Sequence, residues 1–132
     1  MAFDFGTMRI GTAVGQNITG TAKALEVLRA KDGIPNWDSI AALLNQWQPD
    51  FLVVGLPYNM DGSDSELLLR ATKFGNRLHG RFHLPCFGID ERLSSIEAQQ
   101  TELAKPGEAI DSIAACIILE TWFSELALRK PR

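Results

Sequence analysis

The run FLVVGL at residues 51–56 constrains the fold of this chain most strongly. It contains no polar side chain, and successive side chains of a strand point to opposite faces of a sheet. Both faces of this strand must therefore be covered, as in the centre of a sheet with helices on both sides. The run predicts an α/β fold arranged around one buried strand.

The segments before this run predict strands. Residues 2–5 form a first short strand, and RIGTAVG, which begins at Arg9, alternates with a period of two. AKALEVLR supplies a third strand with Leu25 and Val27 on one side. The short links between these strands favour an antiparallel meander.

The segments after it alternate between helix and strand. Helical spacing predicts one helix from Ile40 to Trp47 and another from Leu67 to Leu78, and CFGI is a strand. A short helical stretch follows Ser94 or Ser95, and a longer helix runs from about Ala109 to Leu126. A meander followed by β-α-β crossovers predicts one domain, residues 1–132, with a five-stranded mixed sheet and helices on both faces. The first strand and FLVVGL then lie side by side at the centre.

Composition excludes several classes of protein. Hydrophobic residues make up 45% and charged residues 22%, a globular profile, and the formal net charge is −3. Any nucleic-acid contact must therefore use a local basic patch. Cys86 and Cys116 lack CxxC spacing, which is typical of a reducing compartment. With no apolar leader and no membrane-length run, we expect a cytoplasmic protein without a membrane partner.

Three acids occupy apolar elements. Asp4 lies in the first strand, Glu91 closes the strand PCFGI, and Asp111 lies on the apolar side of the last helix. Burying an ionised carboxylate is costly unless a cation or several hydrogen bonds compensate it. The predicted strand order delivers Asp4 and Glu91 to the same edge of the sheet. The three acids therefore predict a divalent-metal site.

Four blocks, FDFGT, VVGLPYNMDG, DERLSS and IDSIAACIIL, resemble the RuvX (YqgF) family in order and spacing. This family comprises Holliday-junction-resolvase-like proteins and pre-16S ribosomal RNA nucleases. The resemblance implies an RNase H-like three-layer fold and a metal-dependent nuclease that trims the 5′ end of the small-subunit ribosomal RNA precursor. Matched block by block, it implies that Asp4, Glu91 and Asp111 are the catalytic, metal-binding acids.

The chain departs from the family pattern at two places. Met8 stands where the family usually has a lysine, and the connection over residues 96–110 is shorter than the family's glycine- and lysine-rich loop. Whether this connection is complete stays open at the level of sequence. Both departures bear on how firmly the substrate is gripped.

Carboxylates suit this chemistry because Mg²⁺ and Mn²⁺ prefer oxygen ligands. Two such ions about 3.5–4 Å apart activate a water and offset charge on the leaving oxygen. Each acid also has a structural alternative. Asp4 is suited to capping the hairpin and Asp111 to capping the last helix, and Asp90 competes with Glu91 as the inward acid of its strand. Asp61 is expected to serve the turn and to cap the following helix.

Basic residues give two expectations. Arg9 and Arg92 lie nearest the acids in sequence and are the candidates for nucleic-acid contact. A second group of basic residues lies at helical spacing and is interpreted as a solvent-exposed helix face; it comprises Arg70, Lys73, Arg77 and Arg81. Glu66 is expected to form an ion pair with Arg70, four residues further along the helix.

The sequence thus predicts a Mg²⁺- or Mn²⁺-dependent nuclease acting on structured RNA, above all pre-16S ribosomal RNA, as a monomer or weak homodimer. The alternatives are a resolvase of branched DNA and a non-catalytic module that binds RNA or the transcription machinery. DFGT also resembles the phosphate loop of actin-like ATPases, but their machinery needs two domains and 132 residues have room for one. Endo- or exonucleolytic action, and one metal or two, stay open.

Overall fold

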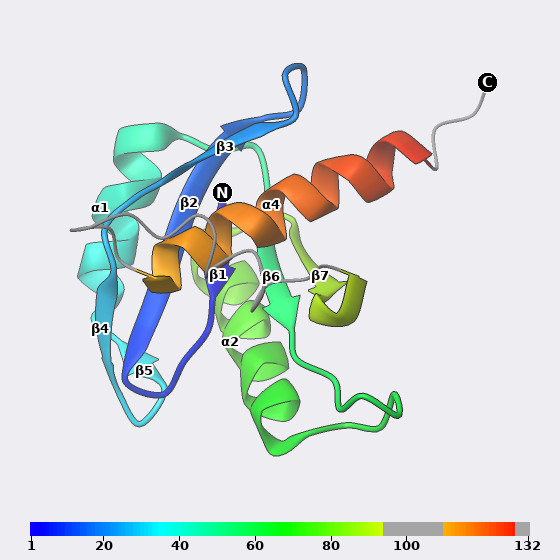
Figure 1. The fold of residues 1–132 in the computed structure, drawn as a ribbon. Helices are drawn as coiled ribbons and strands as arrows, with labels where there is room; N and C mark the ends of the chain where they lie inside the picture. Colours follow the sequence, from blue (N-terminus) through cyan, green and yellow to red (C-terminus); the bar gives the residue numbers. More distant parts are fainter. Residues whose placement is uncertain (94–109, 129–132) are drawn as a thin grey trace.

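The computed structural model describes residues 1–93 and 110–128, and leaves the side chains of residues 110 and 111 undescribed. A mixed sheet lies between two helices on one face and one helix on the other (Figure 1). The elements follow in the order β1 (Ala2–Asp4), β2 (Arg9–Gln16), β3 (Thr21–Ala24), β4 (Leu28–Lys31), β5 (Ile34–Pro35), α1 (Trp37–Trp47), β6 (Leu52–Leu56), α2 (Glu66–Phe82), β7 (Cys86–Asp90), the 3₁₀ turn η1 (Glu91–Leu93) and α4 (Ile110–Leu128). The short helix expected after Ser94 or Ser95 lies outside the described residues.

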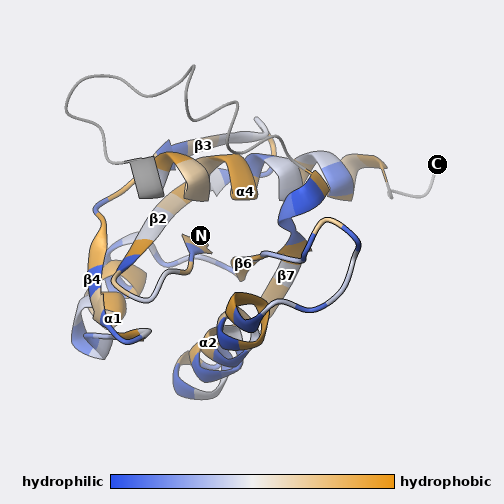
Figure 2. Ribbon diagram, turned by 60° about the horizontal axis from the view of Figure 1, so that its bottom comes forward, coloured by the Kyte–Doolittle hydropathy of each residue, from blue (hydrophilic) through white to orange (hydrophobic). Residues whose placement is uncertain are grey.

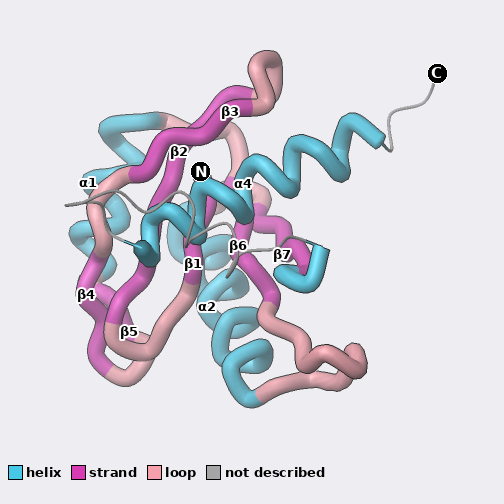
Figure 3. The backbone as a smooth tube through the Cα atoms, in the orientation of Figure 1, coloured by secondary structure: helices cyan, strands magenta, loops and turns pink. Residues whose placement is uncertain are grey.

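The sheet has the predicted centre. β1 pairs in parallel with β6, with Phe3 opposite Val54, and β6 pairs in parallel with β7. β1 also pairs antiparallel with β2, so that the spatial order is β5-β4-β2-β1-β6-β7, with β3 paired to β2 (Figure 3). The mixed α/β architecture is therefore confirmed, but the expected count of five strands is wrong, because the described residues already form a sheet of seven strands.

The count is wrong because the predicted third strand is split in two. β3 pairs with the distal half of β2, whereas β4 pairs with its first residues, Arg9 and Ile10. Between them the chain bends around Thr12, whose carbonyl accepts from the amide of Leu25 at 2.9 Å. The Thr12 hydroxyl donates to the carbonyl of Glu26 at 2.5 Å. The two-residue strand β5, which extends the edge beyond β4, is too short to leave a periodic signal.

The helices begin where side chains cap them. Asn36 Oδ1 accepts from the amide of Asp38, so α1 starts three residues before the expected Ile40. Ser65 Oγ accepts from the amide of Leu68 at 2.9 Å and caps α2. The expectation that Asp61 caps α2 is therefore wrong. Asp61 instead closes the preceding turn, because its Oδ1 accepts from the amide of Ser63 at 2.9 Å.

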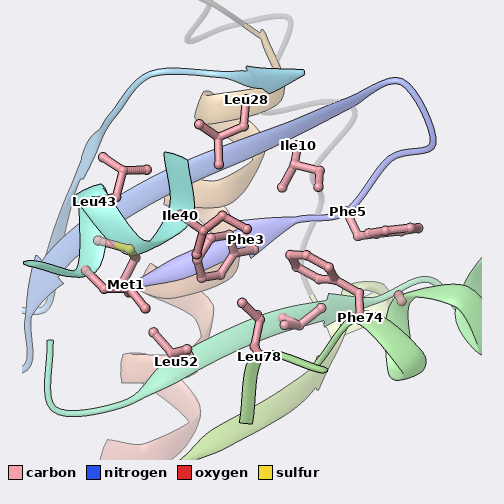
Figure 4. Close-up of a cluster of buried hydrophobic side chains, with 13 residues drawn as sticks. Met1, Phe3, Phe5, Ile10, Leu28, Ile40, Leu43, Leu52, Phe74 and Leu78 are labelled. Carbon is pink, nitrogen blue, oxygen red and sulfur yellow. The ribbon is translucent and has the colours of Figure 1, made fainter. Parts of the chain in front are cut away.

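The face covered by α1 and α2 holds the larger core. Phe74 of α2 packs edge-on against Phe3 at 5.7 Å between ring centroids and lies 5.2 Å from Phe5 (Figure 4). The Phe74 ring also lies 6.0 Å from the Trp37 ring. Ile40 and Leu78, from α1 and α2, are fully buried in the same cluster. Aromatic packing therefore fixes α2 beneath the end of β1.

Helix α4 covers the other face, crossing β2 and β1 (Figure 2). Its buried Ile118, Leu119 and Phe123 pack with Ala2 and Val53 of the central strands. Apolar side chains lie on nearly every side of this helix, which is typical of a buried helix. Among the described residues, no helix combines the length and apolar composition that crossing a membrane requires.

Replacing Phe74 tests whether this aromatic cluster holds the fold. Phe74→Ala removes three ring contacts and leaves a cavity, so we expect the free energy of unfolding to fall by about 3–5 kcal/mol. Leu69→Ala is the matched control on the same helix, since Leu69 is 60% exposed, and it should change stability by less than about 0.5 kcal/mol. Urea denaturation measures both. Equal losses for the two variants would contradict the proposed role of Phe74.

Candidate active site

Asp4 and Glu91 are brought into contact although 86 residues separate them. Asp4 ends β1 and Glu91 follows the last residue of β7, so each stands at the carboxyl end of a parallel strand. The strand between them is β6, which leaves two strand spacings, about 10 Å, to be bridged. The side chains of Glu91 and Asp4 together span this gap, and their carboxyl groups lie within hydrogen-bonding reach of one another.

Gly55 of β6 makes this bridge possible. A Cβ atom placed on Gly55 would lie 2.5 Å from Glu91 Oε1 and 3.1 Å from Glu91 Cγ, too close for any side chain at this position. It would also lie 2.6 Å from Ile118 Cδ1 of α4. The glycine therefore opens a channel across the central strand in which the Glu91 side chain lies beneath α4. A glycine inside an otherwise apolar strand is the sequence signal of such a close approach, yet Gly55 was missed as a functional position at the level of sequence.

The environment of Glu91 opposes its ionisation. Burial raises the pKa of Glu91, the hydrogen bond with Asp4 partly lowers it, and the negative charge of Asp90 raises it further. Two carboxylates this close repel one another when both are ionised, unless a proton or a cation lies between them. The pair therefore attracts positive charge, whether a proton or a metal cation.

Helix α4 begins beside this pair. The amide of Thr12 donates to Ser112 Oγ at 3.3 Å, and Thr12 is the partner of Phe3 in the β1–β2 register. This bond fixes the first turn of α4 against the centre of the sheet. Asp111, the neighbour of Ser112, is the second residue of α4, so its backbone lies in that turn. The direction of the Asp111 side chain lies outside the described residues, and its predicted role stays a prediction.

Asp90 turns away from the pair and binds Arg92. Both of its carboxylate oxygens accept from Arg92 Nε, and Oδ2 accepts from Nη2 at 2.6 Å. Asp90 Oδ1 also accepts from the amide of Arg92 at 2.9 Å and so caps η1. Arg92 holds the pKa of Asp90 below its usual value. Of the two neighbouring acids, Glu91 is therefore the one that faces Asp4.

Arg92 packs against the loop that follows β6, which contains Tyr58 and Gly62. Its guanidinium lies 5.3 Å from the centre of the Tyr58 ring, and a Cβ on Gly62 would come within 3.2 Å of Arg92 Nη1. Asp61 is close enough to raise the pKa of Arg92 together with Asp90. Arg92 thus interacts with Asp90 and Asp61 of its own chain. The predicted contact of Arg92 with nucleic acid stays a prediction.

Arg9 opens β2 on the side of the sheet that carries Asp4. Gly11 is opposite Asp4 in the β1–β2 register, and Arg9, two residues away, shares its face. Across the other edge, Arg9 is opposite Arg29 of β4. Met8, which stands in place of the family's lysine, is 75% exposed in the adjoining loop.

The donor set of the acid pair suits a hard divalent cation, because both groups offer carboxylate oxygens in a partly buried setting. Within residues 1–93 and 112–128, no three His, Cys, Asp or Glu side chains gather around one point. Asp4 and Glu91 supply two candidate ligands in this part of the chain. The predicted third ligand, Asp111, has its side chain outside the described residues.

Known proteins resemble this chain in sequence and in fold. The sequence model of the family described as "RuvX: Holliday junction resolvase" matches residues 1–125. The chain belongs to the RuvX family. It is 54% identical over 131 residues to a protein of Glaesserella parasuis, covering 95% of each chain, and 55% identical over 130 residues to one of Mannheimia succiniciproducens, covering 93% of this chain and 92% of the relative. Both relatives are named "Putative pre-16S rRNA nuclease".

Solved structures confirm the RNase H-like fold class of this RuvX-family chain. Thermus thermophilus RuvC in complex with a Holliday junction substrate superimposes with a TM-score of 0.61 at 16% sequence identity. The match covers 95% of this chain and 93% of that one. At this identity the likeness concerns the fold.

Gly55→Ala tests the channel across β6. The added methyl group must displace Glu91 or α4, so we expect a loss of about 1–3 kcal/mol in stability. Gly80→Ala is the control, because a Cβ there meets nothing within 4 Å and replacing a glycine inside α2 should stabilise the helix by up to about 1 kcal/mol. Thermal or urea unfolding distinguishes them. A stabilising effect of Gly55→Ala would contradict the described contact.

The pKa of Glu91 predicts a pH dependence for the metal-free protein. Because burial raises this pKa above its unfolded value, the favourable contribution of protonated Glu91 is complete below the unfolded pKa and is lost as pH rises through the folded pKa. Glu91→Gln removes this dependence. In EDTA we expect the variant to be more stable than the wild type at about pH 8, with the difference shrinking towards about pH 4. Urea unfolding across this range measures it, and a constant difference would contradict the assignment.

Proposed function

We propose that this chain is a metal-dependent nuclease that hydrolyses phosphodiester bonds in the precursor of 16S ribosomal RNA. The observation that carries the proposal is the hydrogen-bonded pair of Asp4 and Glu91 at the carboxyl end of the central strands, beside the first turn of α4. The names of the RuvX-family relatives, which describe pre-16S rRNA nucleases, support the reaction and the substrate.

Asp4, Glu91 and Asp111 would hold Mg²⁺ or Mn²⁺. When bound, such an ion supplies an activated water and stabilises the charge that develops on the scissile phosphate. Asp4 is mounted on a central strand, which keeps its carboxylate in a fixed position. The absence of a side chain at Gly55 leaves the space across β6 that the Glu91 side chain occupies. The protein thus contributes prepositioned oxygens and a partly buried surrounding in which charges interact strongly.

Two arginines support the substrate in this proposal. Arg9 lies on the face of the sheet that carries Asp4, where it would contact a backbone phosphate. Arg92, in η1, would contact a second backbone phosphate of the substrate. Arg92 also packs against Tyr58 and Gly62 of the loop after β6. We place the protein in the cytoplasm, where bacterial ribosomal RNA precursors are processed, as a single-domain monomer or weak homodimer.

A four-way DNA junction is the competing substrate, because the matching family is described as a Holliday junction resolvase and the likeness to RuvC extends over nearly the whole chain. The relatives' names favour RNA. The two substrates are separated by offering both to the same protein under the same conditions.

The decisive experiment is a cleavage assay with end-labelled pre-16S rRNA leader and a four-way DNA junction in Mn²⁺ or Mg²⁺. We expect RNA cleavage that EDTA abolishes and that Asp4→Asn lowers by more than about 100-fold, since even the partners of metal ligands are worth about 10–100-fold. Glu120→Gln, an exposed acid of α4, is the matched control and should retain activity. Activity that survives both EDTA and Asp4→Asn would exclude the mechanism, and binding without cleavage would point to a non-catalytic module.

Metal binding also has a readout that does not depend on activity. A ligand that binds the folded state at about 100 times its Kd stabilises it by about 2.7 kcal/mol. We therefore expect Mn²⁺ to raise the free energy of unfolding of the wild type and of Glu120→Gln, but not of Asp4→Asn. Equal stabilisation of all three proteins would show that the ion binds elsewhere.

A further inference from the structure

A cavity of about 240 Å³ lies between helix α2 and the turn that joins β4 to β5. Its apolar lining includes Phe5 and Phe74, whose rings are 5.2 Å apart (Figure 4). Three cationic residues and one acid also line it, namely Arg70, Lys73, Arg77 and Asp32. The lining therefore carries three positive charges and one negative charge.

The positive charges are not neutralised along the helix. Residues 70, 73 and 77 share one face of α2, and from residue 67 to residue 82 the helix contains no Asp or Glu. The expectation that Glu66 pairs with Arg70 is wrong, because Arg70 Nη2 donates to the carboxylate of Asp32 at 2.8 Å instead. In the part of the chain that the structure describes, Lys73 and Arg77 have no ion-pair partner. The stripe is thus a concentration of positive charge in a chain whose net charge is −3.

The cavity is built rather than incidental. Arg70 Nη2 also donates to the carbonyl oxygen of Asp32 at 2.7 Å, so two hydrogen bonds to one residue hold its guanidinium at the rim. The next residue is Gly33, with φ of 80°, a conformation that other residues rarely adopt. A Cβ on Gly33 would come within 3.0 Å of Phe5 Cζ and 3.3 Å of Arg70 Nη2. The turn at Gly33 therefore packs against the Phe5 ring at a distance that only a glycine allows.

The cavity adjoins the acid pair around the end of β1. Phe5 directly follows Asp4, and side chains of successive residues point to opposite sides of a strand. Asp4 faces Glu91 on the α4 side, whereas Phe5 packs on Phe74 on the α2 side. A chain that passes over the end of β1 would meet both.

We propose that this cavity binds a backbone phosphate of the nucleic acid whose cleavage site lies at Asp4 and Glu91. The inference rests on the proposed nuclease function and adds a second point of grip on the opposite side of the sheet. Lys73 and Arg77 supply the charge, and Arg70 supplies an oriented donor. A phosphate held here fixes the direction in which the strand crosses the acids. The contact is independent of base identity, as phosphate contacts are.

The test compares single-charge removals that differ only in place. Lys73→Gln and Arg77→Gln, alone and together, are introduced into the Asp4→Asn protein, so that RNA is bound in Mg²⁺ without being cut. Lys23→Gln, on β3 away from the cavity, is the matched control. The double variant loses the one phosphate contact of the cavity. We therefore expect the magnitude of the slope of log K against log salt to fall by about 0.7–0.9 and the affinity to fall about tenfold. Lys23→Gln should change the affinity less than about twofold.

The outcomes separate this inference from the proposed function. If the double variant binds like Lys23→Gln while the protein with Asp4 intact still cleaves RNA, the cavity is not a phosphate site and the nuclease proposal stands. If neither the wild-type protein nor the Asp4→Asn protein binds or cleaves nucleic acid, both proposals fail. Titration calorimetry with inorganic phosphate is the second arm. Heat that the double variant loses while its RNA affinity is unchanged would assign the cavity to a small anion and overturn the inference.

Discussion

The contact between Asp4 and Glu91 is the constraint on which the rest of this structure depends. Two acids in one partly buried place are unfavourable for folding, and burial accordingly raises the pKa of Glu91. The fold accepts this cost at the carboxyl ends of its central strands, where side chains from β1 and β7 converge around β6. Such local conflict within an otherwise consistent fold is typical of a functional site.

The surrounding elements hold the carboxyl groups of Asp4 and Glu91 next to one another. Gly55 gives the Glu91 side chain a path across β6, and Ser112 ties the start of α4 to Thr12 of β2. Arg92 draws Asp90 away from the pair and leaves Glu91 as the inward acid. Beneath the sheet, Phe74 supports Phe5, the neighbour of Asp4. Packing on both faces of the sheet therefore helps to fix the position of the Asp4 carboxylate.

The order of elements followed from periodicity because most of these elements have one clearly buried side. FLVVGL became β6, and its parallel pairing with β1 followed from the handedness of the crossover connections. Local pattern did not separate β3 from β4, because the bend at Glu26 depends on Thr12, a residue 14 positions earlier. It also misjudged Arg70, whose partner Asp32 lies 38 residues away, whereas a helical rule considers only neighbours.

The sequence by itself determined the α/β class, the central strand, the candidate acids Asp4 and the neighbours Asp90 and Glu91, and the membership of the RuvX family, because these depend on residue type and local spacing. Only the tertiary structure decided which of Asp90 and Glu91 faces Asp4, what Gly55 makes room for, and that Arg70, Lys73 and Arg77 line a cavity. Those outcomes depend on distances between elements far apart in the chain. The physical reason is that charge and volume act through space, and folding alone fixes which groups become neighbours.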